Sequence, residues 1–343
     1  MNTEWSIFLN QNGAHGADGV ITDFGDAAAE LQAAAQAPVM SAVSQLGMLC
    51  FSGEDAAKFL QGQLSCDVLA LALYGSVYGA CCSPKGRVLA NFLLWRASDG
   101  YYMAMPRELL PALQKRLGMF VMRSKVKVED TSDRLVILGL SHQQGDAGLV
   151  ALAGAAAAVP HQGVAVADGL LLRLSATRWL WLGTAQAAMG VWSLLADRFR
   201  PVGASAWSWL DIRAGVPWVT AATQDQFVPQ MINLELIGGV SFQKGCYTGQ
   251  EIVARTQYLG KLKRRMYLAH IPVADPPAPG TAIYSDDLGD QASGMVVNAQ
   301  ASPLGGVDML AVAQVASVES SRVHVASLDG QVLACLPLPY ALP

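Results

Sequence analysis

The sequence predicts an α+β fold divided into two or three domains. A chain of 343 residues is longer than the roughly 100 to 200 residues of a typical single domain. Short apolar runs typical of buried strands alternate with segments of helical periodicity between residues 52 and 182. Apolar residues that alternate with polar ones in 315–328, near turn-forming aspartates and glycines, predict short antiparallel strands that close a sandwich or barrel.

The composition is that of a folded protein with a large apolar core. Hydrophobic residues make up 52% of the chain and charged residues 15%, and the mean hydropathy is +0.30, which excludes a disordered chain. The most apolar stretches, 149–160 and 170–182, are too short for a bilayer-spanning helix or contain arginine, so we expect no membrane span. Residues 1–10 lack the positive segment of a secretory signal, and we therefore expect a cytoplasmic protein.

Charge and cysteine spacing limit the kinds of site that the chain can hold. The formal net charge is −4 and the pI is near 5.7, which opposes nonspecific attraction to nucleic acid, so any anion site must be local. The 6 cysteines show no CxxC spacing and the 5 histidines lie far apart in sequence, which argues against a disulfide framework and a zinc site. No Walker loop, Rossmann glycine motif or Ser-His-Asp order is present. We expect no metal site and no nucleoside triphosphate chemistry.

The N-terminal part of the chain predicts alternating helices and strands. The alanine-rich segment 27–37 is typical of an amphipathic helix or of a low-complexity arm, and both interpretations stay open. Ser52 is followed by the acids Glu54 and Asp55 and then by apolar residues at helical spacing. This pattern predicts a helix that ends near Gly62. Residues 88–95 predict a buried strand, 101–105 its partner in a hairpin, and 109–119 a helix.

The middle of the chain predicts strands on either side of a helix. Residues 135–140 and 169–182 have the apolar character of strands, and the alanine-rich segment 149–158 between them predicts a helix. Proline and glycine interrupt the chain at 200–203 and again at 272–280. We interpret these two segments as domain boundaries.

Cys246 stands just before a predicted helix. Thr248 and Glu251 have the spacing of a capping box, in which each side chain accepts a hydrogen bond from the backbone N–H of the other residue. The box predicts a helix that begins at Thr248 and ends at Gly260. Capping alone accounts for Glu251, which favours it over a catalytic role for this carboxylate.

The surroundings of Cys246 favour a reactive thiolate. A helix N-terminus attracts anions, and Lys244 and Arg255 add positive charge on either side. Gly245 lets a ligand approach the backbone, because glycine has no Cβ atom. The alternative is a buried and inert cysteine in a helix entry loop, which is the common state of intracellular cysteines. The flanking residues favour the reactive thiol.

Two further groups of side chains are candidates for ligand binding. Four cations follow the predicted helix within five residues: Lys261, Lys263, Arg264 and Arg265. They suit either an anion-docking surface or a solvated strand edge, and both interpretations stay open. Four aromatic residues have the chemistry to stack a flat heterocycle: Trp207, Trp209, Trp218 and Tyr247. Tryptophans more often lie in a core, so the residues alone favour the core position.

The segment 244–251 resembles a known family signature. It reads KGCYTGQE and matches the KGCYxGQE motif of the folate-binding YgfZ family, whose mitochondrial members are iron-sulfur assembly factors. Further matching segments are FVPQ at 227–230, GGVSF at 238–242, FLQGQ at 59–63 and KGR at 85–87. The resemblance covers most of the chain and is weakest in residues 1–40, in residues 140–200 and in the C-terminal domain.

The resemblance implies a particular architecture. The YgfZ family is similar in fold to the aminomethyltransferase T-protein of glycine cleavage, which has two intertwined α+β units and a C-terminal antiparallel β-barrel-like domain around a central cavity. The implied domains here are a discontinuous folate-binding α+β domain, a second α+β unit and a C-terminal β-domain: 1–130 with 202–265, 131–201 and 266–343.

The resemblance also implies a ligand and the residues that contact it. The ligand is tetrahydrofolate or a one-carbon derivative. Cys246 is expected to be the reactive thiolate, with Lys244 and Arg255 holding its charge. The residues expected to contact the folate are Trp207, Tyr247, Gly245, Gln250, Lys261 and Arg264.

One departure from the T-protein pattern favours an accessory protein over an enzyme. T-proteins carry acidic residues where this chain has Ala90 and Asn91, and a neutral pair cannot take a proton. We therefore expect a protein that supports iron-sulfur cluster assembly or repair and, indirectly, tRNA modification, with iron-sulfur enzymes or assembly proteins as partners. The alternative is a folate-dependent aminomethyl or one-carbon transferase. The acidic net charge disfavours direct tRNA binding.

Overall fold

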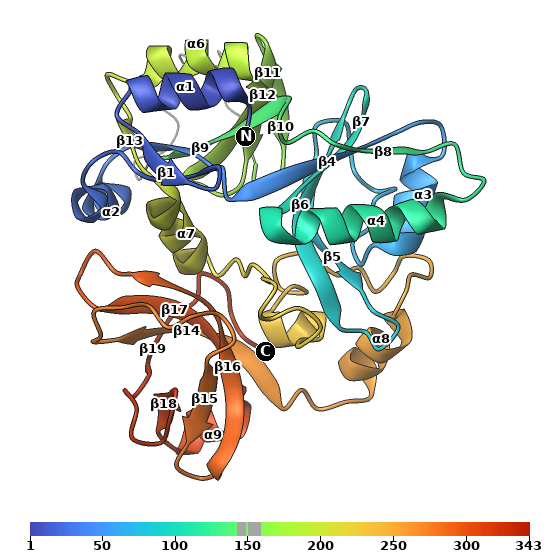
Figure 1. The fold of residues 1–343 in the computed structure, drawn as a ribbon. Coiled ribbons are helices and arrows are strands. Elements are labelled where there is room, and N and C mark those ends of the chain that lie inside the picture. The colour runs from blue at the N-terminus through green and yellow to red at the C-terminus, as the bar shows by residue number, and fades with distance from the viewer. Residues whose placement is uncertain (143–148, 150–158) are drawn as a thin grey trace. The chain divides into compact units, whose positions relative to one another are not determined.

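The computed structural model describes residues 1–142, 149 and 159–343 (Figure 1). The chain forms two compact units, each built from three segments of sequence. Unit 1 comprises Met1–Ala57, Ala70–Val77 and Leu93–Ser208, and unit 2 comprises Lys58–Leu69, Tyr78–Phe92 and Trp209–Pro343. The domain limits expected from the sequence stay a prediction. None of the described helices is long and apolar enough to cross a membrane.

Unit 1 contains a six-stranded sheet with the order β10-β11-β12-β9-β3-β13. The strands are β3 (Val39–Ala42), β9 (Leu135–Ser141), β10 (Gly163–Val166), β11 (Gly169–Arg173), β12 (Arg178–Thr184) and β13 (Arg200–Pro201). All neighbours pair antiparallel except β3 and β13. The predicted strands at 135–140 and within 169–182 are confirmed, the latter as the pair β11 and β12. Of the helix predicted over 149–158, all but residue 149 lies outside the described residues.

Two helices cover one face of this sheet. Helices α1 (Thr3–Gln11) and α6 (Ala185–Leu195) lie side by side on it (Figure 1). Trp5 of α1 and Trp192 of α6 meet edge to face, with ring centroids 5.7 Å apart. Both belong to the apolar core that also contains Trp179 and Trp181 of β12. Burial of these large aromatic side chains stabilises the packing of the helices on the sheet.

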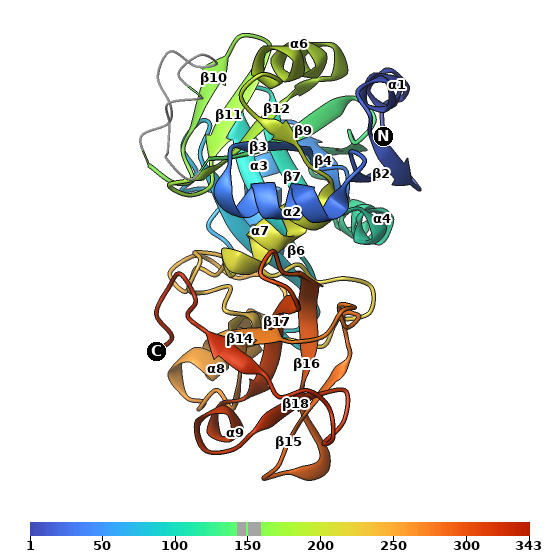
Figure 2. The same ribbon diagram turned by 90° about the vertical axis from the view of Figure 1, so that its left-hand side faces the viewer.

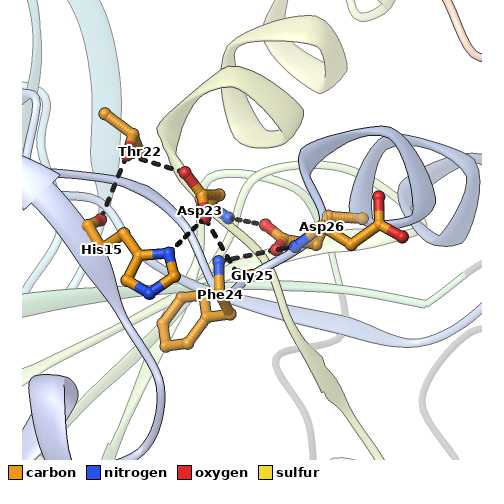
Figure 3. Close-up of polar contacts among 8 residues, drawn as sticks. His15, Thr22, Asp23, Phe24, Gly25 and Asp26 are labelled. Carbon is orange, nitrogen blue, oxygen red and sulfur yellow. Dashed lines mark hydrogen bonds and ion pairs between the residues drawn. The ribbon is translucent and has the colours of Figure 1, made fainter.

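The segment between α1 and β3 is held by a buried carboxylate. It contains β1 (His15–Ala17), β2 (Val20–Asp23) and helix α2 (Ala27–Gln36), which confirms a helix in place of a low-complexity arm. The Glu30 carboxylate of α2 accepts hydrogen bonds from the backbone N–H groups of Phe24 and Gly203, at 2.6 and 2.9 Å. At the surface, Asp23 accepts from Thr22 and contacts the His15 ring (Figure 3). These bonds tie α2 to the loops beside it.

A five-stranded sheet has the order β5-β6-β7-β4-β8. Its strands are β4 (Leu46–Ser52), β5 (Ser76–Cys82), β6 (Val88–Ala97), β7 (Gly100–Pro106) and β8 (Lys127–Asp130). The predicted hairpin is confirmed, since β6 pairs antiparallel with β7 from Leu93–Ala104 to Ala97–Gly100. The predicted helix at 109–119 forms as η1 (Arg107–Leu109) followed by α4 (Leu110–Val121).

Unit 2 begins with a short helix and ends with a curled antiparallel sheet (Figure 2). Its helical elements are α3 (Ala56–Gln63), which starts at the end of unit 1, η3 (Pro229–Ile232), α8 (Gln250–Tyr258) and α9 (Val315–Ser320). The sheet order is β18-β15-β16-β17-β14-β19. Its strands are β14 (Arg264–Ile271), β15 (Ala282–Ser285), β16 (Gly289–Ala301), β17 (Val307–Gln314), β18 (Val323–Val325) and β19 (Ala334–Leu336).

One part of the C-terminal prediction is wrong. Residues 315–320 form helix α9, and only Val323–Val325 of the predicted strand region is a strand. Val315 and Val318 are three residues apart, so the segment fits a helical period as well as an alternating one, and short runs do not separate the two. The buried Ser317 hydroxyl donates to the Asp287 carboxylate at 2.9 Å and accepts from the Ser285 hydroxyl of β15 at 3.2 Å, which ties the helix to the sheet.

Trp207, on helix α7 (Ala204–Arg213), is a core residue of unit 1. Its side chain is 1% exposed. The Arg178 guanidinium lies over the indole, 4.6 Å from the ring centroid. A Cβ atom on Gly139 would lie 2.4 Å from a ring carbon, so glycine is needed in β9 to make room for the indole.

We expect Gly139→Ala to destabilise unit 1 by about 1–3 kcal/mol, because the added methyl group overlaps the Trp207 ring. The midpoint of urea unfolding, followed by tryptophan fluorescence, measures the change. Gly118→Ala in α4 is the matched control, since its Cβ would meet no atom within 4 Å, and alanine should add about 0.5–1 kcal/mol of stability there. Equal midpoints for wild type and Gly139→Ala would contradict the packing.

Candidate functional site

The KGCYTGQE segment forms an exposed loop in front of α8, which we call the Cys246 loop (residues 243–249). Cys246 is exposed, whereas Lys244 and Tyr247 on either side are buried. Gly245 is exposed, and a Cβ atom at this position would meet nothing within 4 Å. The loop therefore presents its thiol to solvent between two anchored side chains.

Lys244 is anchored at the C-terminal end of α3. Its ammonium group donates hydrogen bonds to the main-chain carbonyl oxygens of Gln61 and Leu64. The last carbonyls of a helix lack partners within the helix and carry partial negative charge, so a cation is favoured there. The Lys244 side chain is 8% exposed, and burial lowers the pKa of its ammonium group although Cys66 and Asp67 act in the opposite direction.

Tyr247 completes this anchor. The Lys244 ammonium lies over its ring, 4.9 Å from the centroid. A cation above an aromatic ring is stabilised further when the pair is removed from water. The Tyr247 hydroxyl is buried and has no hydrogen-bond partner among the described residues, and burial raises the pKa of this phenol. Tyr247 thus acts through its ring, which shields the lysine from solvent.

The second end of the loop is fixed at Gly249. This residue has φ +82°, and a Cβ atom there would lie 2.3 Å from the carbonyl oxygen of Ser83. Ser83 begins the turn that leads into β6, since its N–H bonds the Arg87 carbonyl at 2.8 Å. Only glycine combines this left-handed conformation with so close an approach. The conformation of the loop thus depends on both Lys244 and Gly249.

The predicted capping box is wrong. Helix α8 begins at Gln250, its N-cap is Gly249, and no side chain bonds to the cap. The left-handed conformation of Gly249 leaves Thr248 outside the helix, so the spacing with Glu251 no longer fits a box. The Gln250 side chain accepts instead from the Tyr247 N–H at 3.3 Å.

The other residues predicted for the site differ in exposure and in their partners. Arg255 is exposed on α8. Among the described residues, no hydrogen bond or ion pair joins Cys246 to Lys244 or Arg255, and the Lys244 ammonium has main-chain partners instead. Cys246 and Gln250 lie in one segment, whereas Trp207 belongs to the core of the other unit.

The cationic cluster 261–265 divides into two parts. Arg265 is buried and pairs with Glu235 at 2.8 Å, and it also donates to the Asn233 side chain at 3.0 Å. Burial raises the pKa of the Glu235 carboxyl, although Arg265 opposes the shift. Lys261 and Lys263 are exposed, and Arg264 is half-buried. Arg265 therefore serves the fold, and the other three are accessible to a ligand.

Asn91 occupies a structural position that sequence patterns did not reveal. Its side-chain amide donates to the Pro217 carbonyl at 2.7 Å and accepts from the Val219 N–H at 2.8 Å. The side chain is buried and both of its polar atoms are bonded. An amide cannot take a proton at neutral pH, so Asn91 holds the 217–219 segment and supplies no general base.

No family model matches the chain. Curated relatives do, and the tRNA-modifying protein YgfZ of Photobacterium profundum is 30% identical over 303 residues, which cover 86% of this chain and 89% of that protein. The chain belongs to the YgfZ family. The YgfZ protein of Sodalis glossinidius is 33% identical over 306 residues, covering 86% and 90%. That of Yersinia pestis is 32% identical over 321 residues, covering 90% and 97%.

The fold is that of the glycine cleavage T-protein. The aminomethyltransferase T of Bartonella henselae superposes with a TM-score of 0.77, at 16% sequence identity, over 98% of this chain and 96% of that one. At this identity the similarity concerns the fold alone. The α+β architecture and the family expected from the sequence are confirmed for this YgfZ-family protein, with a curled antiparallel sheet at the C-terminal end.

Thiol labelling tests the exposure of the Cys246 loop. We expect iodoacetamide to modify Cys246 first in the native protein and Cys335 more slowly, because burial raises the pKa of Cys335. Labelling of Cys335 should accelerate as the pH rises. The buried thiols should react only after unfolding in urea, and burial raises the pKa of one of them, Cys66, to about 12.

Mass spectrometry of the labelled peptides assigns each phase. The Cys246→Ser variant should lose the fast phase, and the Cys335→Ser variant should keep it. A fast phase that persists in Cys246→Ser would contradict the exposed position of this thiol.

Proposed function

We propose that this protein is a cytoplasmic, tetrahydrofolate-binding accessory protein that supports assembly or repair of iron-sulfur clusters and, through iron-sulfur enzymes, tRNA modification. The main support for this proposal is the exposed Cys246 thiol, which lies on a loop whose two ends are held at Lys244 and Gly249. A thiol that transfers sulfur, handles a cluster or exchanges electrons with a partner protein must be accessible. The relatives named tRNA-modifying proteins support the link to tRNA.

The fold supports tetrahydrofolate or a one-carbon derivative as the ligand. The T-protein-like architecture is the basis of this assignment. Tyr247, Gly245, Gln250, Lys261 and Arg264 are the proposed contacts in unit 2. Gly245 and Lys261 are exposed, so they are accessible to a ligand without a change in structure.

The contact proposed for Trp207 requires a local rearrangement. Its indole is 1% exposed and lies under the Arg178 guanidinium. A pterin ring reaches the indole only when Arg178 moves aside. A stacking contact would then replace the cation–π contact, and its free energy would have to offset the displacement of the buried Arg178 side chain.

The neutral pair Ala90 and Asn91 supports an accessory protein over a folate-dependent one-carbon transferase. Both polar atoms of the Asn91 side chain are bonded to the 217–219 segment, so this side chain has no proton-transfer role. Incubation of the pure protein with labelled methylenetetrahydrofolate and amine acceptors separates the two functions. We expect no turnover without a partner protein, and catalytic turnover would establish the transferase.

The Cys246→Ser variant should lose cellular function while it retains the fold and the affinity for tetrahydrofolate. The substitution removes one exposed sulfur atom that makes no hydrogen bond within the described residues. The readout is the activity of iron-sulfur enzymes in cells that lack the endogenous protein, which should fall to the level of the deletion strain. Cys335→Ser, at the other exposed thiol, should restore wild-type activity. Full complementation by Cys246→Ser would remove the thiol from the mechanism.

Tetrahydrofolate should quench the intrinsic tryptophan fluorescence of the protein. If the ligand stacks on Trp207, most of the quenching disappears in Trp207→Phe and remains in Trp192→Phe, a buried tryptophan of the same unit. Equal quenching and equal affinity in Trp207→Phe would exclude this residue from the site. Absence of binding to the wild-type protein by calorimetry would refute the folate assignment itself.

A further inference from the structure

Unit 2 contains a pocket of about 380 Å³ at the start of β14. Its volume falls in the range of small-molecule sites, about 300–1,000 Å³. Apolar side chains such as Phe227, Met231 and Met295 line it, together with three cations, Arg87, Lys263 and Arg264. None of the described residues that line the pocket is acidic. It therefore combines an apolar surface with an uncompensated positive charge.

The two guanidinium groups are fixed by main-chain carbonyls. Arg87 donates from Nη1 to the carbonyl oxygens of Asp225 and Gln226, at 3.2 and 3.1 Å. Arg264 donates from Nη2 to the carbonyl oxygen of Ala292 at 3.3 Å. Each guanidinium has five N–H donors, so most of them remain for a ligand. A fixed fork of donors matches the oxygen atoms of an anion and loses little entropy on binding.

Lys263 adds a third positive charge, and its backbone is held by a hydrogen bond. Its carbonyl oxygen accepts from the Val315 N–H at 2.9 Å, which ties the segment before β14 to the end of β17. Within the described parts of the chain, none of Arg87, Lys263 and Arg264 forms an ion pair with a carboxylate. Three cations that line one pocket without an ion-paired carboxylate repel one another, and a bound anion reduces this repulsion.

We propose that this pocket binds a small organic anion in which a phosphomonoester group is carried by an aromatic or aliphatic body. A phosphomonoester carries about −1.5 to −2 charges at neutral pH and offers three acceptor oxygens, which suits three cations better than a single carboxylate does. Burial of the apolar lining is favourable only when a ligand displaces water from it, so the ligand needs an apolar body. Cys246 does not line this pocket, and Arg264 is the one described lining residue that is also a proposed tetrahydrofolate contact.

Methyl NMR of methionine-labelled protein tests the proposal with phenyl phosphate as the probe. Saturating phenyl phosphate should shift the methyl signals of Met231 and Met295, which line the pocket. The signals of Met119 and Met122, which are exposed in unit 1, should not move. Inorganic phosphate lacks the apolar body and should bind at least about tenfold more weakly.

Variants test the cations one at a time. Arg87→Gln and Arg264→Gln should each weaken phenyl phosphate binding about tenfold, since each removes a charged donor. Lys263→Gln changes an exposed side chain without a hydrogen bond in the described structure, so it should preserve the fold and still weaken binding severalfold. Lys85→Gln is the matched control, because Lys85 is exposed, lies near Arg87 in sequence and does not line the pocket. This variant should bind phenyl phosphate as tightly as the wild-type protein does.

Four results would overturn the proposal. The first is an absence of shifts at Met231 and Met295, and the second is equal affinity in Lys263→Gln and Lys85→Gln. The third is inorganic phosphate binding as tightly as phenyl phosphate, which would leave the apolar walls without a role. The fourth is tighter binding of the aromatic dicarboxylate phthalate, which would replace the phosphomonoester by a carboxylate ligand.

Discussion

The arrangement of the candidate site depends on one interaction, in which a buried lysine binds the end of a helix. The Lys244 ammonium donates to carbonyls of Gln61 and Leu64, which lie 183 and 180 residues away in sequence. Removing an ammonium group from water is costly, which is why burial lowers the pKa of Lys244. Two charge-assisted hydrogen bonds and the Tyr247 ring offset this cost.

The consequence for the loop is that an exposed thiol sits on an ordered backbone. Exposed loop residues usually move more than the elements they connect. Here Lys244 anchors the chain two residues before Cys246, and the left-handed Gly249 lies close to the Ser83 backbone three residues after. Cys246 is accessible, and it lies two residues from an anchored side chain. Such a position suits a group that must meet the reactive atom of a partner protein in a defined geometry.

Local periodicity was sufficient to predict several elements of the fold. The β6–β7 hairpin, the helix at 56–63 and the strands β9, β11 and β12 follow from the spacing of apolar residues. The short segment 315–320 was assigned to a strand because its period is ambiguous over six residues. The predicted capping box failed because a tertiary contact at Gly249 places the helix start two residues later than the local pattern does.

The partners of the site residues were harder to predict than the elements. Lys244 was expected to act on the neighbouring thiol, because sequence proximity is visible and the open carbonyls at the end of α3 are not. Arg265 was grouped with its cationic neighbours, although its partner Glu235 lies 30 residues earlier. The folate contact that the resemblance implies for Trp207 stays a prediction, and the glycine in β9 that makes room for its ring belongs to a distant segment. Each of these contacts is set by the tertiary fold, which local patterns do not encode.

The chemistry of the lysine anchor also determines how the loop responds to salt. Exposed ion pairs weaken as ionic strength rises, because mobile ions screen charges separated by water. The Lys244 ammonium instead meets uncharged carbonyl dipoles under an aromatic ring, at 8% exposure, where screening by dissolved ions is weaker. The position of the Cys246 thiol should therefore depend less on the electrolyte around the protein than contacts made by exposed ion pairs do.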